Sequence, residues 1–473
     1  MIDLKNLTIK KAHEAIKSGE YTCRELTQAY LDQIEKKNKE LNVYLEVFGD
    51  ALAQADEADK KFKSGTAVLL TGIPFAIKDN ILIEGKKVSA ASKMLENYIA
   101  SYDATVIKKL KSEGAVFLGR VNLDEFAMGG STENSAFGPT RNPHDPRRVA
   151  GGTSGGSTAA VAADMALVAL GSDTGGSVRE PASFCGIVGL KPTYGRVSRY
   201  GLMAMGSSLD CIGSAAKNTE DAEIVFRSIA GHDDLDSTSL EDTKENPINK
   251  KLTIGVPWDF INKEGVNPEV KKNFMASVEK LKAGGYEVKD ISIQNIDLVL
   301  AIYYIIMPAE VSTNLARLDG VRYGLHQDGK NLMEDYFFSR GKGFGPETRR
   351  RVLLGTYVLS AGYYDAYYSK AQTARTFLKK EFEKAFKNID LILTPTAPMP
   401  AWKVGEKSDP LSVYLADIFT VTANIVGIPA ISVPSGFMEM EGKSLPLGIQ
   451  FMAPHGGEDL LFEIGKKFEQ IAL

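Results

Sequence analysis

Two clusters rich in glycine and serine lie close together near the middle of the chain, at residues 151–156 and 174–177. Between them, residues 157–165 have the small-residue pattern of a packed helix, and residues 166–170 have the unbroken apolar pattern of a buried strand. A helix followed directly by a strand is a compact way to bring two loops to one edge of a sheet. The pattern therefore predicts that both clusters lie at the same edge of a β-sheet.

Each cluster supplies glycines and one serine hydroxyl, from Ser154 in the first and from Ser177 in the second. Glycine permits backbone angles that other residues avoid. A run of glycines also exposes backbone N–H groups, which can hold an anion or a developing oxyanion. We therefore interpret this stretch as a catalytic centre with two serines.

Helix and strand patterns alternate along the rest of the chain. A helical pattern covers residues 22–37, where Thr22 and Glu25 have the spacing of a capping box, and apolar strand patterns cover residues 72–80 and 115–121. This alternation predicts an α/β fold in which helices cover a sheet. A chain of 473 residues suggests about three domains by length alone, but one large α/β unit also fits.

Composition excludes several classes of function. The formal net charge is −4, so no global basic field favours nucleic acid. The three cysteines, Cys23, Cys185 and Cys211, have no CxxC spacing, which indicates a reducing compartment and no structural zinc site. The first twenty residues lack a signal-peptide core, and no run of about 18 apolar residues predicts a membrane span. We expect a cytoplasmic protein with no bound metal and no membrane contact.

The first cluster is compatible with two kinds of serine chemistry. Residues 152–156 match GxSxG, the nucleophile elbow of α/β-hydrolases, which needs an acid and a histidine later in the chain. The histidines that follow, His232, His326 and His455, lie in no obvious site loop.

Lys78 is the alternative base. It ends an apolar strand pattern, and burial lowers the pKa of an amine toward neutrality, where it can accept a proton. Serine–lysine pairs are a known variant of the catalytic triad. The ordinary alternative is an exposed lysine at a strand end.

The second cluster also has an ordinary alternative, a tight turn between a strand and a helix. If Ser177 begins the next helix, nearby N–H groups point at a bound carbonyl oxygen. Asp173 is expected to brace the turn. Arg179 and Glu180 are expected to form a surface ion pair that contributes little to stability.

Searches for other chemistries find no motif. The sequence has no GxxxxGK[ST] loop for ATP, no HExxH zinc motif and no GxGxxG between a strand and a helix. The two serines and Lys78 therefore remain the main catalytic candidates.

Together these segments resemble a known family. Residues 151–163 and 171–197 are similar to the amidase signature, and residues 74–80 match its upstream segment. The resemblance covers essentially the whole chain. It implies a single domain over residues 1–473, with a mixed central β-sheet covered by helices on both faces.

The resemblance also implies roles for individual residues. Ser177 would be the nucleophile that forms an acyl-enzyme, and Lys78 would be the base. Ser154 would be the bridging serine, held by a cis peptide bond after Thr153. The N–H groups of Thr174, Gly175 and Gly176 would stabilise the oxyanion.

Further segments resemble one branch of the family, the glutaminase subunits of tRNA-dependent amidotransferases. They are residues 125–140, 309–317, 350–357 and 360–368. Because these segments lie outside the general amidase signature, they favour this branch and imply glutamine as the substrate.

In this branch, Arg351 and Asp417 would hold the α-carboxylate and the α-amine of glutamine, with Tyr303 or Tyr304 nearby. A neighbouring arginine leaves the register open by one residue, so Arg350 is the alternative to Arg351. A free amino acid needs one cation and one anion in its pocket, which suits this pairing.

The resemblance further implies partners. Ammonia from glutamine would pass to a B subunit, which holds ATP, Mg and the misacylated tRNA and converts Glu-tRNA(Gln) to Gln-tRNA(Gln). A small C subunit would clamp the two. No cofactor is expected in this chain, and the missing ATP loop agrees with this division of labour.

Three positions depart from the family pattern. Threonine stands at position 153 where serine is common, Glu180 stands where glutamine is common, and residues 211–214 replace a Gln-Ile-Gly-Pro run. None of these changes removes a proposed catalytic residue.

Two other functions remain open. A stand-alone amidase for small or aryl amides would share the fold but would not need the Arg351–Asp417 pair. A binding or scaffold protein with an inactive site is the third possibility, and the intact Lys78, Ser154 and Ser177 speak against it.

Overall fold

The computed structural model describes residues 2–241, 251–407 and 409–472. The strands within these residues are β1 Tyr44–Val47, β2 Pro74–Lys78, β3 Val116–Val121, β4 Arg141–Asn142, β5 Asp145–Val149, β6 Val168–Asp173, β7 Val188–Lys191, β8 Cys211–Ala216, β9 Thr253–Val256, β10 Glu287–Asp290, β11 Leu391–Pro395, β12 Ala430–Met440 and β13 Lys443–Met452.

Helices surround these strands. They are α1 Ile9–Ser18, α2 Cys23–Leu41, α3 Ala51–Ser64, α4 Thr105–Glu113, α5 Gly155–Ala162, α6 Arg179–Cys185, α7 Thr219–Ile229, α8 Trp258–Ile261, α9 Pro268–Ala283, α10 Val299–Leu315, α11 Leu332–Gly343, α12 Pro346–Leu359, α13 Lys370–Ala385, α14 Pro410–Tyr414, α15 Val421–Val426 and α16 Glu458–Ala472. Short 3₁₀ turns are η1 Lys93–Leu95, η2 Glu125–Ala127, η3 Ile296–Leu298 and η5 Leu415–Asp417, and η4 Tyr364–Ser369 is a π-helix.

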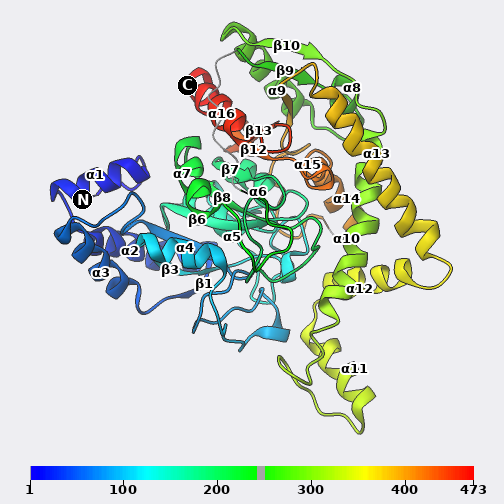
Figure 1. Ribbon diagram of the computed structural model, residues 1–473, viewed down its shortest axis with the longest axis horizontal. Helices are drawn as coiled ribbons and strands as arrows, with labels where there is room; N and C mark the ends of the chain where they lie inside the picture. The colour runs from blue at the N-terminus through cyan, green and yellow to red at the C-terminus, as the bar shows by residue number, and fades with distance from the viewer. Residues whose placement is uncertain (1, 242–250, 408, 473) are drawn as a thin grey trace.

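One mixed sheet organises the fold. Among the described residues, eleven strands pair in the order β1-β3-β2-β6-β8-β7-β12-β13-β11-β9-β10, and β4 pairs with β5 separately. β2 runs parallel to β3 and to β6, whereas β8, β7, β12 and β13 continue the sheet with antiparallel pairs. Helices flank the sheet, as Figure 1 shows, which confirms the predicted α/β class with a mixed central sheet.

The parallel pair β2 and β6 brings the catalytic candidates to one sheet edge. In this pair Phe75 lies opposite Val168 and Ile77 lies opposite Leu170. The carboxyl ends of parallel strands meet at the same edge. Lys78, the last residue of β2, therefore lies next to the end of β6, where the second glycine cluster begins. The predicted convergence of both clusters on one edge is confirmed.

The helix α5 starts directly after Ser154, two residues earlier than its sequence pattern predicts. Glycines open this helix because it packs very closely on the sheet. A Cβ at Gly156 would lie 2.3 Å from the backbone oxygen of Asn122. Close packing thus decides the residues at this helix start, in spite of the low helix propensity of glycine.

The predicted strand at residues 166–170 extends to Asp173 as β6. Its last residues are held by an antiparallel partner, in which Gly171 lies opposite Gly213 and Asp173 opposite Cys211. That partner, β8, is not among the strands that the sequence predicts. A fully buried strand of small residues has no alternation that distinguishes it from a loop.

Other local predictions hold. Thr22 and Glu25 form the predicted capping box at the start of α2, where each side chain bonds to the other residue's backbone N–H.

The segment Ile296–Leu315, which includes α10, has the length and mean hydropathy, 1.5, of a membrane span. Asp297 and Glu310 interrupt its apolar residues, so an uninterrupted apolar run does not predict it. Half of its most apolar window is buried, and α10 packs against α12, α13 and α15 as a core helix.

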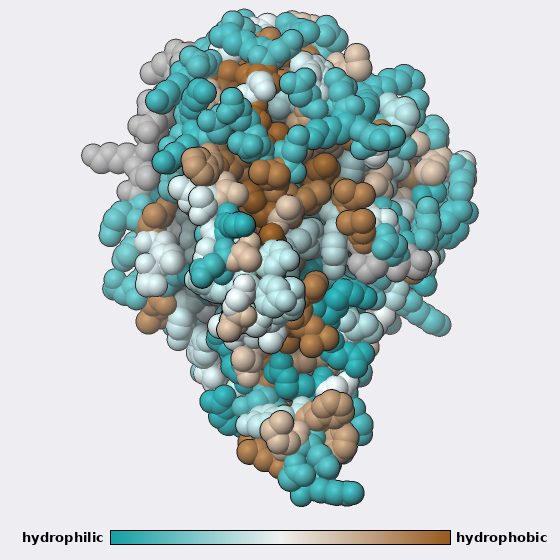
Figure 2. All heavy atoms as spheres, turned by 90° about the vertical axis from the view of Figure 1, so that its right-hand side faces the viewer, coloured by the Kyte–Doolittle hydropathy of each residue, from teal (hydrophilic) through white to brown (hydrophobic). Residues whose placement is uncertain are grey.

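The face formed by α11, α12 and α13 exposes many hydrophobic side chains. Figure 2, which views the molecule from this side, shows hydrophobic groups spread between hydrophilic ones. The exposed large side chains on these helices and the adjacent η4 segment include Met333, Phe337, Leu353, Leu354, Tyr357, Tyr363, Tyr364, Tyr367 and Phe377. Such surfaces mark contact sites for other proteins more often than isolated hydrophobic side chains do.

We predict that Gly156→Ala lowers the free energy of unfolding by about 1–3 kcal/mol, because the added methyl group overlaps the backbone of Asn122. Gly341→Ala is the matched control. Gly341 lies in the exposed helix α11, and no atom lies within 4 Å of the position that its added methyl group would take. This control should raise stability by about 0.5 kcal/mol. Urea unfolding of both variants checks the prediction, and equal effects would contradict the packing argument.

Candidate active site

Lys78 and Ser154 are in direct contact inside the protein. The Nζ atom of Lys78 lies 2.9 Å from Ser154 Oγ, 2.7 Å from Thr153 Oγ1 and 2.9 Å from Ser172 Oγ. It also lies 3.2 Å from the carbonyl oxygen of Ser172. All of these side chains are buried. The structure thus places the predicted base beside the predicted bridging serine.

Burial lowers the pKa of Lys78 from its ordinary value of 10.5 to about 7, although Asp124, Asp173 and Asp210 oppose this shift. A large fraction of Lys78 is therefore neutral near neutral pH. A neutral amine has a lone pair, so it can accept the proton of one neighbouring hydroxyl while it donates to the others. The hydroxyls of Thr153 and Ser154 both lie within its reach, and the Ser154 hydroxyl also donates to the carbonyl oxygen of Ser172 across 3.1 Å.

Ser177 lies next to Ser154 through the backbone. The N–H group of Ser154 donates to the carbonyl oxygen of Ser177 across 2.9 Å. Ser177 is 8% exposed, whereas Ser154 and Lys78 are fully buried. Within the described part of the chain, the Ser177 hydroxyl has no hydrogen-bond partner. It is therefore the member of the trio that is free to meet a substrate.

The cis peptide bond lies one position earlier than the resemblance implies. It joins Gly152 to Thr153, not Thr153 to Ser154. Gly152 packs against backbone on the other side of the site, since a Cβ there would lie 2.3 Å from the nitrogen of Ser131. The threonine at position 153 keeps the hydroxyl of the usual serine, and that hydroxyl is the nearest partner of Lys78.

Asn80 and Asp79 have different roles beside Lys78. The amide of Asn80 donates to Ser172 Oγ across 3.0 Å, so it helps to orient a hydroxyl that contacts the lysine. Asp79 instead accepts from Ser89 and pairs with Arg120 at 3.0 Å. Of the two residues after Lys78, Asn80 thus belongs to the site and Asp79 to its supporting structure.

The predicted oxyanion loop is only partly free to act. The N–H group of Gly176 donates to Asp173 Oδ1 across 2.9 Å, so this donor is already engaged. The N–H groups of Thr174, Gly175 and Ser177 have no hydrogen-bond partner among the described residues. These three are the donors that the geometry leaves available, with Ser177 in place of Gly176.

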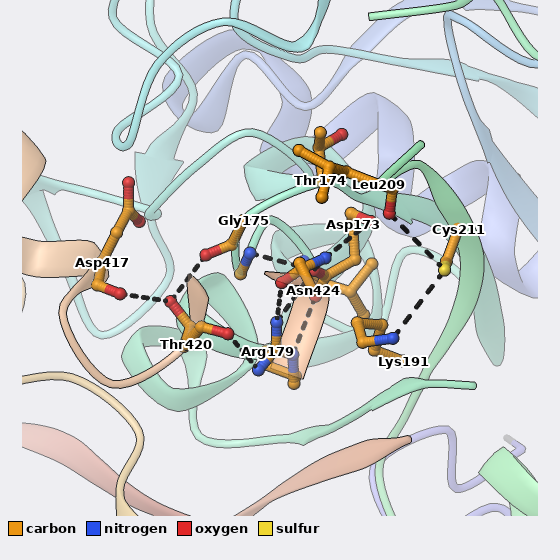
Figure 3. A network of polar contacts seen from close by, with 12 residues as sticks. Asp173, Thr174, Gly175, Arg179, Lys191, Leu209, Cys211, Asp417, Thr420 and Asn424 are labelled. Carbon is orange, nitrogen blue, oxygen red and sulfur yellow. Dashed lines mark hydrogen bonds and ion pairs between the residues drawn. The ribbon is translucent and has the colours of Figure 1, made fainter. Parts of the chain in front are cut away.

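Asp173 and Arg179 form a fully buried ion pair, and the predicted surface pair of Arg179 with Glu180 is wrong. The guanidinium donates to both carboxylate oxygens, at 3.0 and 2.9 Å. Its other N–H groups reach Thr420, Asn424 and Gln450. Figure 3 shows this network. Arg179 holds the pKa of Asp173 down to about 2 against the opposing effect of burial.

Thr420 links the oxyanion loop to the predicted substrate residue Asp417. Its hydroxyl donates to the carbonyl oxygen of Gly175 across 2.8 Å, and its N–H group donates to the carbonyl oxygen of Asp417 across 3.0 Å. Figure 3 places Asp417, Thr420 and Gly175 side by side. The loop that carries Asp417 is therefore fixed against the loop that precedes Ser177.

Of the two neighbouring arginines, Arg351 is buried, whereas the side chain of Arg350 is 43% exposed. Arg351 Nε lies 2.7 Å from Glu347 Oε1, and its guanidinium carbon lies 5.8 Å from the ring of Tyr304 and 5.4 Å from that of Tyr414. A cavity of about 190 Å³ is lined by both arginines, together with Glu347 and Tyr414. This cavity has the polar lining that a small charged ligand requires.

Both predicted tyrosines reach the site, in different ways. Tyr304 OH donates to Asp417 Oδ2 across 3.1 Å, and so it lies between Asp417 and Arg351. Tyr303 packs against the oxyanion loop, since a Cβ on Gly175 would lie 2.6 Å from its hydroxyl. Burial raises the pKa of Asp417 to about 7, although Arg351 and Tyr304 oppose the shift.

The sequence analysis does not predict two residues of this region, Glu347 and Tyr414. Glu347 binds Arg351 and also accepts a hydrogen bond of 2.7 Å from Tyr414 OH. Tyr414 stacks on Tyr304 with ring centroids 4.1 Å apart. The four-residue spacing of Glu347 and Arg351 on one helix was a usable signal. A lone tyrosine far along the chain gives none.

Within the described residues, no group of three or more histidine, cysteine, aspartate and glutamate side chains could hold a metal ion. The polar groups at the sheet edge instead bond to one another and to the backbone, as described above.

Comparison with known proteins finds relatives over nearly the whole chain. The family model described as Amidase matches residues 25–462. The A subunit of glutamyl-tRNA(Gln) amidotransferase from Thermoanaerobacter pseudethanolicus is 50% identical over 479 residues, which cover 99% of this chain and 97% of the relative.

Solved structures agree with the family match. The A subunit of glutamyl-tRNA(Gln) amidotransferase from Thermotoga maritima is 40% identical, with a TM-score of 0.79, and the match covers 99% of this chain and 94% of that one. The peptide amidase from Stenotrophomonas maltophilia is 26% identical, with a TM-score of 0.82, and the match covers 99% of this chain and 97% of that one.

We predict that Lys78 titrates with a midpoint near pH 7, because burial favours its neutral form. NMR of lysine-labelled protein can follow this titration, with Lys78→Met to assign the signal. The rate at which Ser177 reacts with an acylating reagent should rise with pH through the same midpoint, since only the neutral amine accepts a proton. A midpoint close to that of exposed lysines would contradict the assignment of Lys78 as the base.

Proposed function

The chain belongs to the amidase family, and we propose that it is the glutamine-hydrolysing subunit of a tRNA-dependent amidotransferase that converts Glu-tRNA(Gln) to Gln-tRNA(Gln). Likeness at about half identity over the full length supports this branch of the family. The single observation that carries the substrate is the charge pair. Arg351 and Asp417 both contact Tyr304, and Thr420 links Asp417 to Gly175, two residues before Ser177.

Free glutamine fits this pair because it carries two opposite charges on one carbon. Arg351 binds the α-carboxylate with the guanidinium N–H groups that Glu347 leaves free, and Asp417 binds the α-ammonium. The side-chain amide then points toward Ser177. Tyr303 contacts Gly175 and Tyr304 contacts Asp417, so in this proposal the two rings line one side of the path from the charge pair to Ser177.

The first half of the reaction forms an acyl-enzyme. Ser177 Oγ attacks the amide carbon of glutamine, and the carbonyl electron pair moves onto oxygen. The proton of Ser177 passes to Ser154, while the proton of Ser154 passes to neutral Lys78. The N–H groups of Thr174, Gly175 and Ser177 stabilise the oxyanion, which is the largest single contribution in reactions of this kind.

The second half restores the enzyme. The carbon–nitrogen bond breaks as Lys78 returns a proton through Ser154 to the departing nitrogen, which leaves as ammonia. Water then attacks the ester carbon and gives a proton to Lys78 by the same route. The bond to Ser177 breaks, Ser177 recovers its proton, and glutamate leaves. Lys78 thus ends in the neutral form in which it began.

Partner subunits use the ammonia in this proposal. A B subunit holds ATP, Mg and the misacylated tRNA, and a small C subunit clamps the pair, so this chain needs no cofactor of its own. The hydrophobic side chains exposed on α11, α12 and α13 supply a surface for such partners. We place the assembly in the cytoplasm, with the chain acting as one domain around its central sheet.

A stand-alone amidase remains the second candidate, because the structure also matches a peptide amidase. The buried Arg351 and its partner Glu347 favour the amino-acid substrate over this alternative. An aryl amide has no charge for either Arg351 or Asp417 to bind.

We predict that the purified chain releases ammonia from glutamine, and that the rate rises when B and C subunits and charged tRNA are added. Ser177→Ala should reduce the rate by about 10³-fold or more, because no other group can form the ester. An ammonia assay checks this, with propionamide as an uncharged comparison substrate. Strong activity on propionamide and none on glutamine in any mixture would favour the stand-alone amidase.

A further inference from the structure

Glu180 is a buried acidic side chain for which the mechanism above has no use. It stands in the first turn of α6, three residues after Ser177, and is fully buried. The guanidinium of the neighbouring Arg179 binds Asp173, so it does not neutralise Glu180.

The two oxygens of Glu180 have different surroundings. Oε2 accepts a hydrogen bond of 2.9 Å from the N–H group of Gly152. Oε1 is buried and has no hydrogen-bond partner among the described residues. An ionised carboxylate needs donors at both oxygens when it is buried, and this one has a single neutral donor.

The turn that Glu180 holds is the one that carries Ser154. Gly152 lies two residues before that serine, and α6 contacts the turn at two residues. Glu180 binds Gly152, and a Cβ on Gly151 would lie 2.7 Å from the backbone of Pro181. A shift of this turn would move Ser154 away from Lys78.

The charges around Glu180 oppose its ionisation. Burial is the largest effect and raises its pKa well above the usual value. Asp417 and Asp124 raise the pKa further. Lys407 acts in the opposite sense, but its amine is occupied by the carbonyl oxygen of Ser412, at 3.0 Å, and by the ring of Trp402. The pocket therefore tolerates one anion better than two.

We propose that Glu180 works as an uncharged carboxylic acid, a positioning residue that holds the Gly152 turn and so presents Ser154 to Lys78. Its proton resides on Oε1, and Oε2 acts as the acceptor. In this state Glu180 has the shape and the hydrogen-bonding capacity of a glutamine side chain. It also leaves Asp417 as the anion that binds the α-ammonium of the substrate, a consequence that rests on the proposed function.

Stability measurements test the protonated state without any assay of activity. A carboxyl group whose pKa is raised on folding loses stability as pH rises above the value of the unfolded chain. Glu180→Gln keeps the acceptor for Gly152 and cannot ionise. The Tm of this variant should exceed that of the natural chain at pH 8, and the difference should shrink toward zero at pH 4.5.

Glu458→Gln is the matched control. Glu458 is also buried in the first turn of a helix, and its carboxylate accepts one backbone N–H, from Thr193, across 2.8 Å. It lies within electrostatic reach of the cation Lys191. This variant should not gain stability with rising pH. A Glu180→Gln variant whose Tm difference is independent of pH would overturn the proposal.

Kinetics then separate positioning from charge. Glu180→Gln should keep the rate of glutamine hydrolysis within about threefold, whereas Glu180→Ala should lower kcat by about 10²-fold, because a small misplacement of a catalytic group costs that much. A loss of activity in Glu180→Gln equal to that in Glu180→Ala would show that the charge is required. If the natural chain hydrolyses no glutamine, the proposed function fails, and the Tm experiment still decides the state of Glu180.

Discussion

The buried ion pair of Asp173 and Arg179 is the contact on which the rest of the site depends. All five N–H groups of the guanidinium have acceptors, two on Asp173 and three on other residues. Asp173 in turn accepts from Gly176 and Val178, the residues on both sides of Ser177. Breaking such a pair by removing one partner costs about 3–5 kcal/mol. The pair thus fixes the loop that presents Ser177, together with the segment that carries Thr420.

A second constraint is the burial of Lys78. The parallel pairing of β2 with β6 places this lysine under the loops of both serines, where no carboxylate among the described residues touches its amine. The cost of a buried charge then favours the neutral amine, which can act as a base. The same sheet geometry that excludes water from Lys78 therefore also sets its chemistry, and no histidine is needed.

The sequence predicted the fold class and the meeting of the two glycine clusters, because small-residue and apolar periods are local signals. It also led to Lys78, Ser154 and Ser177. It did not predict β8, the burial of Arg179 and Glu180, or the contact of Tyr414 with Glu347. These features arise where segments 28 or more residues apart meet, and no local pattern encodes such contacts. The hydrogen bond from the N–H group of Gly176 to Asp173 was likewise not predicted. Asp173 is the last residue of β6, and the apolar pattern in the sequence ends three residues earlier, at Leu170.

In the proposed reaction, Ser177 forms the ester with the side-chain carbonyl of glutamine. The most direct measurement is peptide mapping by mass spectrometry after reaction with a glutamine analogue that carries a diazoketone in place of the amide. We expect one adduct, on Ser177, that excess glutamine suppresses and that Lys78→Met greatly slows. An adduct on Ser154 or on a cysteine, with Ser177 unmodified, would contradict it.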